Sequence, residues 1–358
     1  KKVSGLKNMN FFKGLGSYFD KVQRMRKLGA IISDELLISK EKVELSATIC
    51  KTDLISEIVG EFPELQGIMG GHLSHAQGFD KEIVDAVKEQ YLPIGPDSNV
   101  SKKPFSITLS LADRIDTLIG FFGVNEKPTS SKDPYALRRI ALGIIRIIIE
   151  NKKNIKINDL LSYSLNIYSD QDFNFTNNTL VKDISNFLKD RFKYYLKEKN
   201  IRHDIIDATT KILDLNKIST AYEKAKCLNK VINKSTGEDI VSSYKRAFNI
   251  LNSEIKNIDE DLSNITDPGI FKNDIEKALY KKTNELKQYF SGMTNKQNFD
   301  ETLIYLATAK NEVFDFFDNV KVNDESEVVK KNRLELLNFF CKTYENFIDF
   351  QLIKDINE

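Results

Sequence analysis

The sequence predicts an all-α protein, and three observations support this fold class. Apolar residues recur at spacings of three and four through most of the chain. Several of these segments are preceded by residues that start helices. Alternating strand patterns flanked by hairpin turns are absent. With 358 residues, 41% of them apolar and 29% charged, the chain resembles a globular protein with enough length for two domains.

Composition narrows the possible partners and compartment. The chain has 53 basic and 52 acidic residues, so a nucleic acid would have to be met by a local basic surface. Cys50, Cys227 and Cys341 are widely spaced and odd in number, which predicts neither a disulfide framework nor a cysteine zinc site and fits a reducing cytoplasm. The longest apolar run, 144–149, is interrupted by Arg146 and is far below the roughly 20 residues that span a bilayer.

The first unusual segment is Glu61-Phe62-Pro63-Glu64-Leu65-Gln66-Gly67-Ile68-Met69-Gly70. Proline removes a backbone donor and glycine loosens the backbone, so an irregular turn is expected here. His72 and His75 follow, three residues apart, and on a helix they would share a face able to bind a metal or a phosphate. The alternative, two partly exposed loop histidines, is favoured by the glycines before them.

Two helices are predicted next. Between Ile107 and Phe122, apolar residues repeat at three and four. The following helix is expected to start with Asp133 as its N-cap and Pro134 as its first residue, and to run to Glu150.

The C-terminal part begins after a segment rich in Ser, Gly and Asn. Residues 233–239 are therefore the best linker candidate, which gives predicted domains of 1–232 and 233–358. Asp324-Glu325-Ser326-Glu327 predicts the start of a long helix that continues through Leu334, Leu337, Phe340 and Phe347.

Several blocks, in one order along almost the whole chain, resemble the β subunit of the bacterial heterodimer-type glycyl-tRNA synthetase. Besides 61–70, they are Leu111-Ala112-Asp113-Arg114-Ile115-Asp116-Thr117-Leu118-Ile119-Gly120, Lys127-Pro128-Thr129-Ser130-Ser131-Lys132-Asp133-Pro134-Tyr135-Ala136-Leu137-Arg138-Arg139, Phe316-Phe317-Asp318-Asn319-Val320 and Asn332-Arg333-Leu334-Glu335-Leu336-Leu337. The resemblance implies the C-terminal half of that subunit. Lys1-Lys2-Val3, with no initiator Met and no apolar leader, is then neither a signal peptide nor a natural start.

The resemblance also implies a function. The chain would bind tRNA(Gly) and support ATP-dependent attachment of glycine, in a cytoplasmic assembly of two α and two β subunits. No phosphate-cradling glycine loop followed by Lys and Ser or Thr is present. We therefore expect no catalytic residue and no cofactor in this chain, with ATP and Mg²⁺ used through the α subunit, and no membrane partner.

The first domain resembles an HD-type helical domain. Asp53, Glu57 and Asp113 are expected remnants of its metal site, but the imidazoles that a working site needs are missing beside them. Lys51 lies two residues before Asp53, and its ammonium would repel a metal ion. A His-Asp dipeptide, the pair that gives the HD domain its name, is present at His203-Asp204, but it lies far downstream of these residues. A metal-dependent phosphohydrolase remains the enzymatic alternative, and a scaffold that mainly contacts other subunits is the third possibility.

The candidate tRNA-facing residues of the first domain are Lys132, Arg138, Arg139 and Arg146. Arg139, Gly143 and Arg146 would line one stripe of a helix, and the glycine would leave a gap for a phosphate or a partner helix. The structural alternative pairs Arg138 and Arg139 with Asp113, Asp116 or Glu61.

The region from about Asp239 resembles the DALR-type anticodon-binding domain. Its candidate tRNA-binding residues are Lys245, Arg246, Lys281, Lys282, Lys330, Lys331 and Arg333. Lysines of this kind supply affinity through counterion release. Tyr244, Phe248, Tyr280 and Tyr289 are candidates for stacking on unpaired bases. Arg333 has a structural alternative, as a partner of Asp318 or Asp324. Phe314, Phe317, Phe339, Phe340 and Phe347 are expected to pack in the core.

Overall fold

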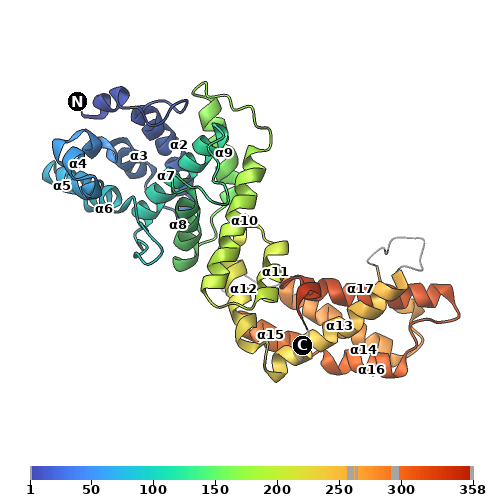
Figure 1. The fold of residues 1–358 in the computed structure, drawn as a ribbon. Coiled ribbons are helices and arrows are strands. Elements are labelled where there is room, and N and C mark those ends of the chain that lie inside the picture. The colour runs from blue at the N-terminus through green and yellow to red at the C-terminus, as the bar shows by residue number, and fades with distance from the viewer. Residues whose placement is uncertain (1, 256–261, 263–264, 292–297, 355–358) are drawn as a thin grey trace. The chain divides into compact units, whose positions relative to one another are not determined.

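A computed structural model of the chain describes residues 2–255, 262, 265–291 and 298–354, and these residues fold as helices joined by turns and loops (Figure 1). No β-strand occurs within these ranges, where only an isolated bridge links Asn10 and Ser17. The all-α prediction is confirmed.

The chain forms two compact units that interleave in sequence. The first consists of Lys1–Tyr195 with Asp214–Ser219, and the second of Leu196–Leu213 with Thr220–Glu358. The predicted boundary after residue 232 therefore lies inside the second unit.

The first unit is built around α7 (Pro104–Gly123), which is buried along most of its length and packs against α2, α6, α8 and α9. The prediction of a helix over 107–122 is confirmed. The helices of this unit in chain order are α1 (Lys2–Gly5), η1 (Leu6–Asn8), α2 (Tyr18–Leu36), α3 (Lys40–Ile49), η2 (Thr52–Ile55), α4 (Glu57–Glu61), η3 (Pro63–Leu65), α5 (Ile68–Ala76), α6 (Lys81–Glu89), α7, α8 (Leu137–Glu150), α9 (Ile157–Ser169), most of α10 (Leu180–Glu198), and η4 (Leu215–Lys217).

The Glu61–Gly70 segment adopts the predicted irregular conformation. Helix α4 ends at Glu61, a single 3-10 turn follows at Pro63–Leu65, and α5 starts only after Gly67, whose φ of 79° favours glycine. His72 and His75 lie on α5 and are both exposed. The expectation that they sit in a loop was wrong, because α5 runs through both of them.

Asp133 caps α8, although the predicted start of that helix was wrong. The Asp133 carboxylate accepts from the backbone N–H groups of Leu137 (2.8 Å) and Arg138 (3.0 Å). Helix α8 begins at Leu137, because Ala136 adopts a left-handed conformation (φ 54°) and ends a turn that contains Pro134. The cap therefore reaches the helix from one turn upstream.

The second unit packs α13 (Ser235–Ile255) against α15, α16 and α17, and α14 against α16 and α17. The other elements in chain order are α11 (His203–Lys211), the remainder of α12 (Ile218–Val231), η5 (Pro268–Ile270), α14 (Asp274–Ser291), α15 (Phe299–Ala307), α16 (Lys310–Asn319), α17 (Glu327–Glu345) and η6 (Phe350–Leu352). The long helix predicted after Asp324 is confirmed as α17, but Phe347 lies beyond its end.

The proposed linker at 233–239 is mostly helical. Helix α13 starts at Ser235, which leaves three residues between it and α12. A Cβ at Gly237 would lie 2.4 Å from the carbonyl oxygens of Val231 and Ile232. This glycine therefore permits close approach of two helix ends. The small residues that were interpreted as a linker are needed for this contact.

Candidate functional site

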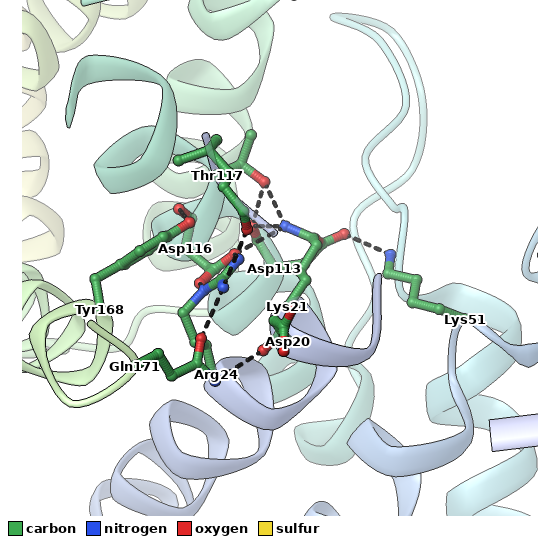
Figure 2. Close-up of polar contacts among 10 residues, drawn as sticks. Asp20, Lys21, Arg24, Lys51, Asp113, Asp116, Thr117, Tyr168 and Gln171 are labelled. Atoms are coloured by element: carbon green, nitrogen blue, oxygen red, sulfur yellow. Dashed lines mark hydrogen bonds and ion pairs between the residues drawn. The ribbon is translucent and has the colours of Figure 1, made fainter. Parts of the chain in front are cut away.

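The position of the expected HD remnants is occupied by a buried ion network on α2, α7 and the segment before η2 (Figure 2). Lys51 Nζ lies 2.8 Å from Oδ2 of Asp113, and Lys21 Nζ lies 2.8 Å from Oδ1. Lys21 Nζ is also 3.1 Å from Oδ2 of Asp116, whose Oδ1 accepts from Arg24 Nε at 2.6 Å. Three cations therefore neutralise two carboxylates.

Burial and charge act in opposite directions in this network. Burial alone would raise the pKa of Asp113, but the ammonium groups of Lys21 and Lys51 outweigh it and hold that pKa well below its usual value. Burial alone would lower the pKa of Lys51, and Asp113 with the Tyr91 side chain raises it instead. Both groups of the Lys51–Asp113 pair are therefore charged at neutral pH.

The aromatic side chains complete the network. Arg24 lies over the ring of Tyr168, with 4.0 Å from Cζ to the ring centroid, and donates to Oε1 of Gln171 at 2.9 Å. Tyr168 donates its hydroxyl to the carbonyl of Asp116 (3.1 Å), as seen in Figure 2. This arrangement fixes α2 against α7 and α9, which is a structural role.

Asp53 is engaged elsewhere. Its Oδ2 accepts from the backbone N–H groups of Gly67 (2.6 Å) and Gly70 (3.0 Å), so the carboxylate caps the start of α5. A Cβ at Gly70 would meet this carboxylate at 3.0 Å. The glycines of the 61–70 segment thus serve the approach of Asp53, a role that the sequence did not suggest.

The residues present do not fit a divalent metal. Oδ1 of Asp53 is buried without a hydrogen-bond partner, but it is a single oxygen, and Glu57 is exposed. Asp113 is enclosed by two ammonium groups, as described above. Within the described ranges no group of three His, Cys, Asp or Glu side chains could hold an ion.

The His203-Asp204 dipeptide is divided between two environments. His203 is 85% exposed and pairs with Asp207 on its own helix. Asp204 is buried, where its carboxylate accepts from Arg202 and from the backbone N–H of Lys354 at 2.8 Å. Burial alone would raise the pKa of Asp204, and these hydrogen bonds lower it. Asp204, and not His203, therefore anchors α11 within the second unit.

The four cations proposed for the first domain take different positions. Lys132 and Arg139 are exposed, and neither side chain has a partner in the part of the chain that the structure describes. Arg138 donates to the carbonyl of Thr129. The alternative pairings with Asp113, Asp116 or Glu61 were wrong for both arginines, because Asp113 and Asp116 already hold Lys21, Arg24 and Lys51.

Arg146 is a structural residue. It is buried and donates to Oε1 of Glu150 (2.8 Å) and to the carbonyls of Gly95 (2.8 Å) and Ser98 (2.7 Å). The gap expected at Gly143 is filled, since a Cβ there would lie 2.9 Å from Nε of Arg114. Burial lowers the pKa of Arg114 to about 10. The expected stripe for a phosphate or a partner helix is therefore closed.

Arg333 has the structural partner that was its alternative. It is buried, and it contacts Glu276 (Nε to Oε1, 2.6 Å) and Asp324 (Nη1 to Oδ2, 2.9 Å). Lys330 lies 3.3 Å from Glu254 with 12% of its side chain exposed, and Lys331 also has a partner. The three α17 cations are therefore already engaged by other groups of the chain. Contact with a phosphate would require these existing pairs to break.

The most accessible candidates of the second unit lie on α14. Lys281 is exposed and has no partner among the described residues, and Lys282 lies 5.1 Å from the ring centroid of Tyr305. Arg246 pairs with Asp318 (2.7 Å) over the ring of Phe314, while Lys245 has a partner of its own.

The aromatic candidates divide in the same way. Tyr244 is fully buried and donates to Glu345 (2.8 Å), so it cannot stack on a base without unfolding. Phe340 and Phe347 are core residues, as predicted, whereas Phe314, Phe317 and Phe339 are only half-buried. Tyr289 is half-buried, and its ring centroid lies 4.8 Å from that of Tyr305, a residue that was not among the candidates predicted from the sequence.

Comparison with known proteins identifies the class and then the family. A sequence model of the DALR anticodon binding domain matches residues 240–354, and one of the glycyl-tRNA synthetase beta subunit matches residues 1–211. The chain belongs to the glycyl-tRNA synthetase β subunit family.

Individual relatives agree with this assignment. The glycine–tRNA ligase beta subunit of Rickettsia canadensis is 36% identical over 351 residues, covering 97% of this chain and 50% of the relative. Those of Rickettsia felis and Cereibacter sphaeroides are 34% and 32% identical over 352 residues, covering 98% of this chain and 49% and 50% of the relatives. The chain spans about half the length of the curated relatives it matches.

Proposed function

We propose that this chain is a tRNA(Gly)-binding part of a glycine–tRNA ligase, and that its second unit binds the anticodon arm. The observation that carries the proposal is the match of the DALR anticodon binding domain to residues 240–354, a range that contains most of α13 and all of α14–α17 and η6. Unpaired lysine charge on α14 and half-buried tyrosines beside it are what a surface for a single-stranded RNA loop requires.

The chemistry of the ligase belongs to the partner in this proposal. The α subunit would bind ATP and Mg²⁺ and form glycyl-adenylate, within a cytoplasmic assembly of two α and two β subunits. This chain would bind the tRNA and would contribute no catalytic residue. Every helix in the described ranges is too short or too polar to cross a bilayer.

The first unit is proposed to be an HD-type helical domain that has lost its hydrolase function. The supporting observation is the Lys21–Asp113–Lys51 bridge, in which two ammonium groups take both oxygens of the carboxylate that would bind an ion. This argues against the phosphohydrolase alternative. Lys132 and Arg139, both exposed, are the candidates in this unit for contact with tRNA.

A nuclease footprint tests the proposal against the scaffold alternative. The 358-residue chain is mixed with end-labelled tRNA(Gly) and with a tRNA for another amino acid as the control. We expect protection of the anticodon arm of tRNA(Gly) at lower protein concentration than for the control tRNA. A chain that binds purified α subunit but protects no nucleotide would establish the scaffold function instead.

A further inference from the structure

One short stretch of the first unit exposes a cluster of large apolar side chains. They are between 39% and 50% exposed, and we call them the 55–68 surface: Ile55, Ile58, Phe62 and Ile68. No other stretch of this length within the described ranges exposes as many. They belong to η2, α4, the residue after α4, and α5, and η2 contacts both α4 and α5. Exposed apolar side chains that gather in this way mark a surface that binds another domain or chain.

Local hydrogen bonds fix the direction of these side chains. The Ser56 hydroxyl caps α4 by accepting from the backbone N–H of Val59 (3.3 Å), and Val59 is the residue of α4 that is buried. The backbone N–H of Phe62 donates to the carbonyl of Ile58 (2.8 Å), so these two residues lie one turn apart on the same side. The Asp53 carboxylate holds the start of α5. The surface is therefore formed before a partner arrives.

The charges around this surface indicate the kind of partner. Residues 52–80 contain no Lys or Arg, whereas Glu57, Glu61 and Glu64 are all exposed. Carboxylates repel phosphate groups, so this face does not suit RNA. An apolar centre with a charged rim suits a protein surface, and the acidic rim selects one that carries Lys or Arg around its own apolar residues.

Two observations favour one occupant. The chain spans about half the length of its curated relatives, and the resemblance described above implies that the remaining part of the subunit precedes it. Helix α1 contacts η2, and a Cβ at Gly5 would lie 3.0 Å from Cδ1 of Ile55. A domain joined to α1 would therefore be held at high local concentration beside the 55–68 surface.

We propose that the 55–68 surface is the docking site for the part of the β subunit that precedes this chain. That part covers Ile58 and Phe62 with apolar side chains and places Lys or Arg opposite Glu57 and Glu61. This contact lies within one subunit, and it does not depend on the tRNA-binding function proposed above.

Hydroxyl-radical footprinting tests the proposal, because it measures how accessible individual side chains are to solvent. The 358-residue chain is compared with a full-length β subunit that carries it, both without α subunit and without tRNA. We expect oxidation of Phe62 to be about fivefold slower in the full-length subunit, as for a ring in a close-packed interface. Tyr163 on α9, 47% exposed against 50% for Phe62, is the internal control and should be oxidised equally in both proteins.

A substitution then tests whether the protection comes from this surface. Ile58→Asp in the full-length subunit should return the oxidation rate of Phe62 to within about twofold of the rate in the 358-residue chain, because a buried unpaired carboxylate disfavours docking. Ile212→Asp, at an isoleucine of the second unit with the same exposure (48% against 47%), should leave the protection unchanged. In the 358-residue chain, Ile58→Asp should change the melting temperature by less than about 2 °C.

Each alternative occupant gives a different result. Protection of Phe62 that appears only after α subunit is added would assign the surface to that subunit and overturn the proposal. Protection that requires tRNA(Gly), or no protection in any of these mixtures, would overturn it as well. So would protection that survives Ile58→Asp. If Ile58→Asp prevents folding of the full-length subunit, the comparison of the two unsubstituted proteins decides the question.

Discussion

Lys51 Nζ lies 2.8 Å from Oδ2 of Asp113, while the other oxygen of the same carboxylate is 2.8 Å from Nζ of Lys21. Both lysine side chains are 2% exposed. A carboxylate enclosed in this way has its charge compensated within the protein. It stabilises the packing of α2 and α7 around the segment that carries Lys51, and it offers little to an external cation.

Lys51→Met is predicted to destabilise the first unit by about 3 kcal/mol, because it leaves part of the charge of Asp113, whose side chain is only 14% exposed, uncompensated. The free energy of unfolding in urea measures the effect. Lys81→Met, at an exposed lysine without a partner among the described residues, is the control and should change stability by less than about 0.5 kcal/mol. A loss below about 1 kcal/mol for Lys51→Met would show that Lys21 alone suffices.

Mn²⁺ is predicted not to bind between Asp53 and Asp113, because one carboxylate caps α5 and the other is enclosed by lysines. Titration calorimetry with Mn²⁺ should give no saturable heat above that of the Asp113→Asn variant. Crystals grown in Mn²⁺ with anomalous density at either carboxylate would refute this prediction and revive the phosphohydrolase alternative.

Acid sensitivity of the second unit is predicted to depend on Asp324. Hydrogen bonds from Lys272 and from the backbone of Ser326 lower the pKa of Asp324 to about 2. Because the folded-state pKa lies below the unfolded value of about 3.9, the stabilisation is complete above about pH 4 and is lost as pH falls towards 2. In Asp324→Asn, the free energy of unfolding should vary less between pH 4 and 2 than in the parent chain. Equal slopes in both proteins would contradict the role given to this carboxylate.

The salt dependence of tRNA binding should identify the lysines that face RNA. If Lys281 and Lys282 each neutralise one phosphate, replacing both by Met should reduce the slope of log Kd against log salt by about 1.4 to 1.8. The pair Lys81→Met and Lys88→Met, exposed on α6, is the matched control. Arg333→Met should leave the slope unchanged, because Arg333 is paired internally with Glu276 and Asp324.

Glycine-dependent pyrophosphate exchange should be undetectable with this chain alone, since its sequence has no loop that could cradle the phosphates of ATP. Addition of purified α subunit is expected to produce the exchange. Exchange activity of this chain without the α subunit would show that the β subunit itself can form the adenylate.

Helices were predictable where a local pattern determines them. The spacing of apolar residues in 107–122 predicted α7. Asp133 was recognised as a cap because the backbone N–H groups that it accepts from, such as that of Leu137, lie close to it in sequence. The start of α8 was missed, since the left-handed conformation of Ala136 leaves no compositional signal. A linker was predicted at 233–239, where α13 in fact begins, because a segment that lets two helix ends approach closely at Gly237 has the same composition as a flexible joint.

The site was less predictable because its contacts are distant in sequence. The sequence indicated that the charge of Lys51 would repel a metal ion. It did not indicate that Lys51 pairs with Asp113, because Asp113 lies 62 residues away. The partner of Arg333, Glu276, lies 57 residues earlier in the chain. Only the fold therefore shows that Arg333 pairs with a carboxylate and not with a phosphate. Tyr305 gave no signal at all, because its significance comes from Tyr289 on another helix.

The interleaving of the two units has a consequence for synthesis on the ribosome. Asp204 emerges 150 residues before Lys354, whose backbone N–H it accepts, and Lys211 likewise precedes its ion-pair partner Asp349. The first unit, meanwhile, receives Asp214–Ser219 only after α11 of the second has been made. The first unit can therefore be completed only after α11 has been synthesised, although α11 belongs to the second unit. Until residues 349–354 are synthesised, α11 lacks its contacts with Asp349 and Lys354, and Asp204 has only neighbours such as Arg202 as hydrogen-bond donors.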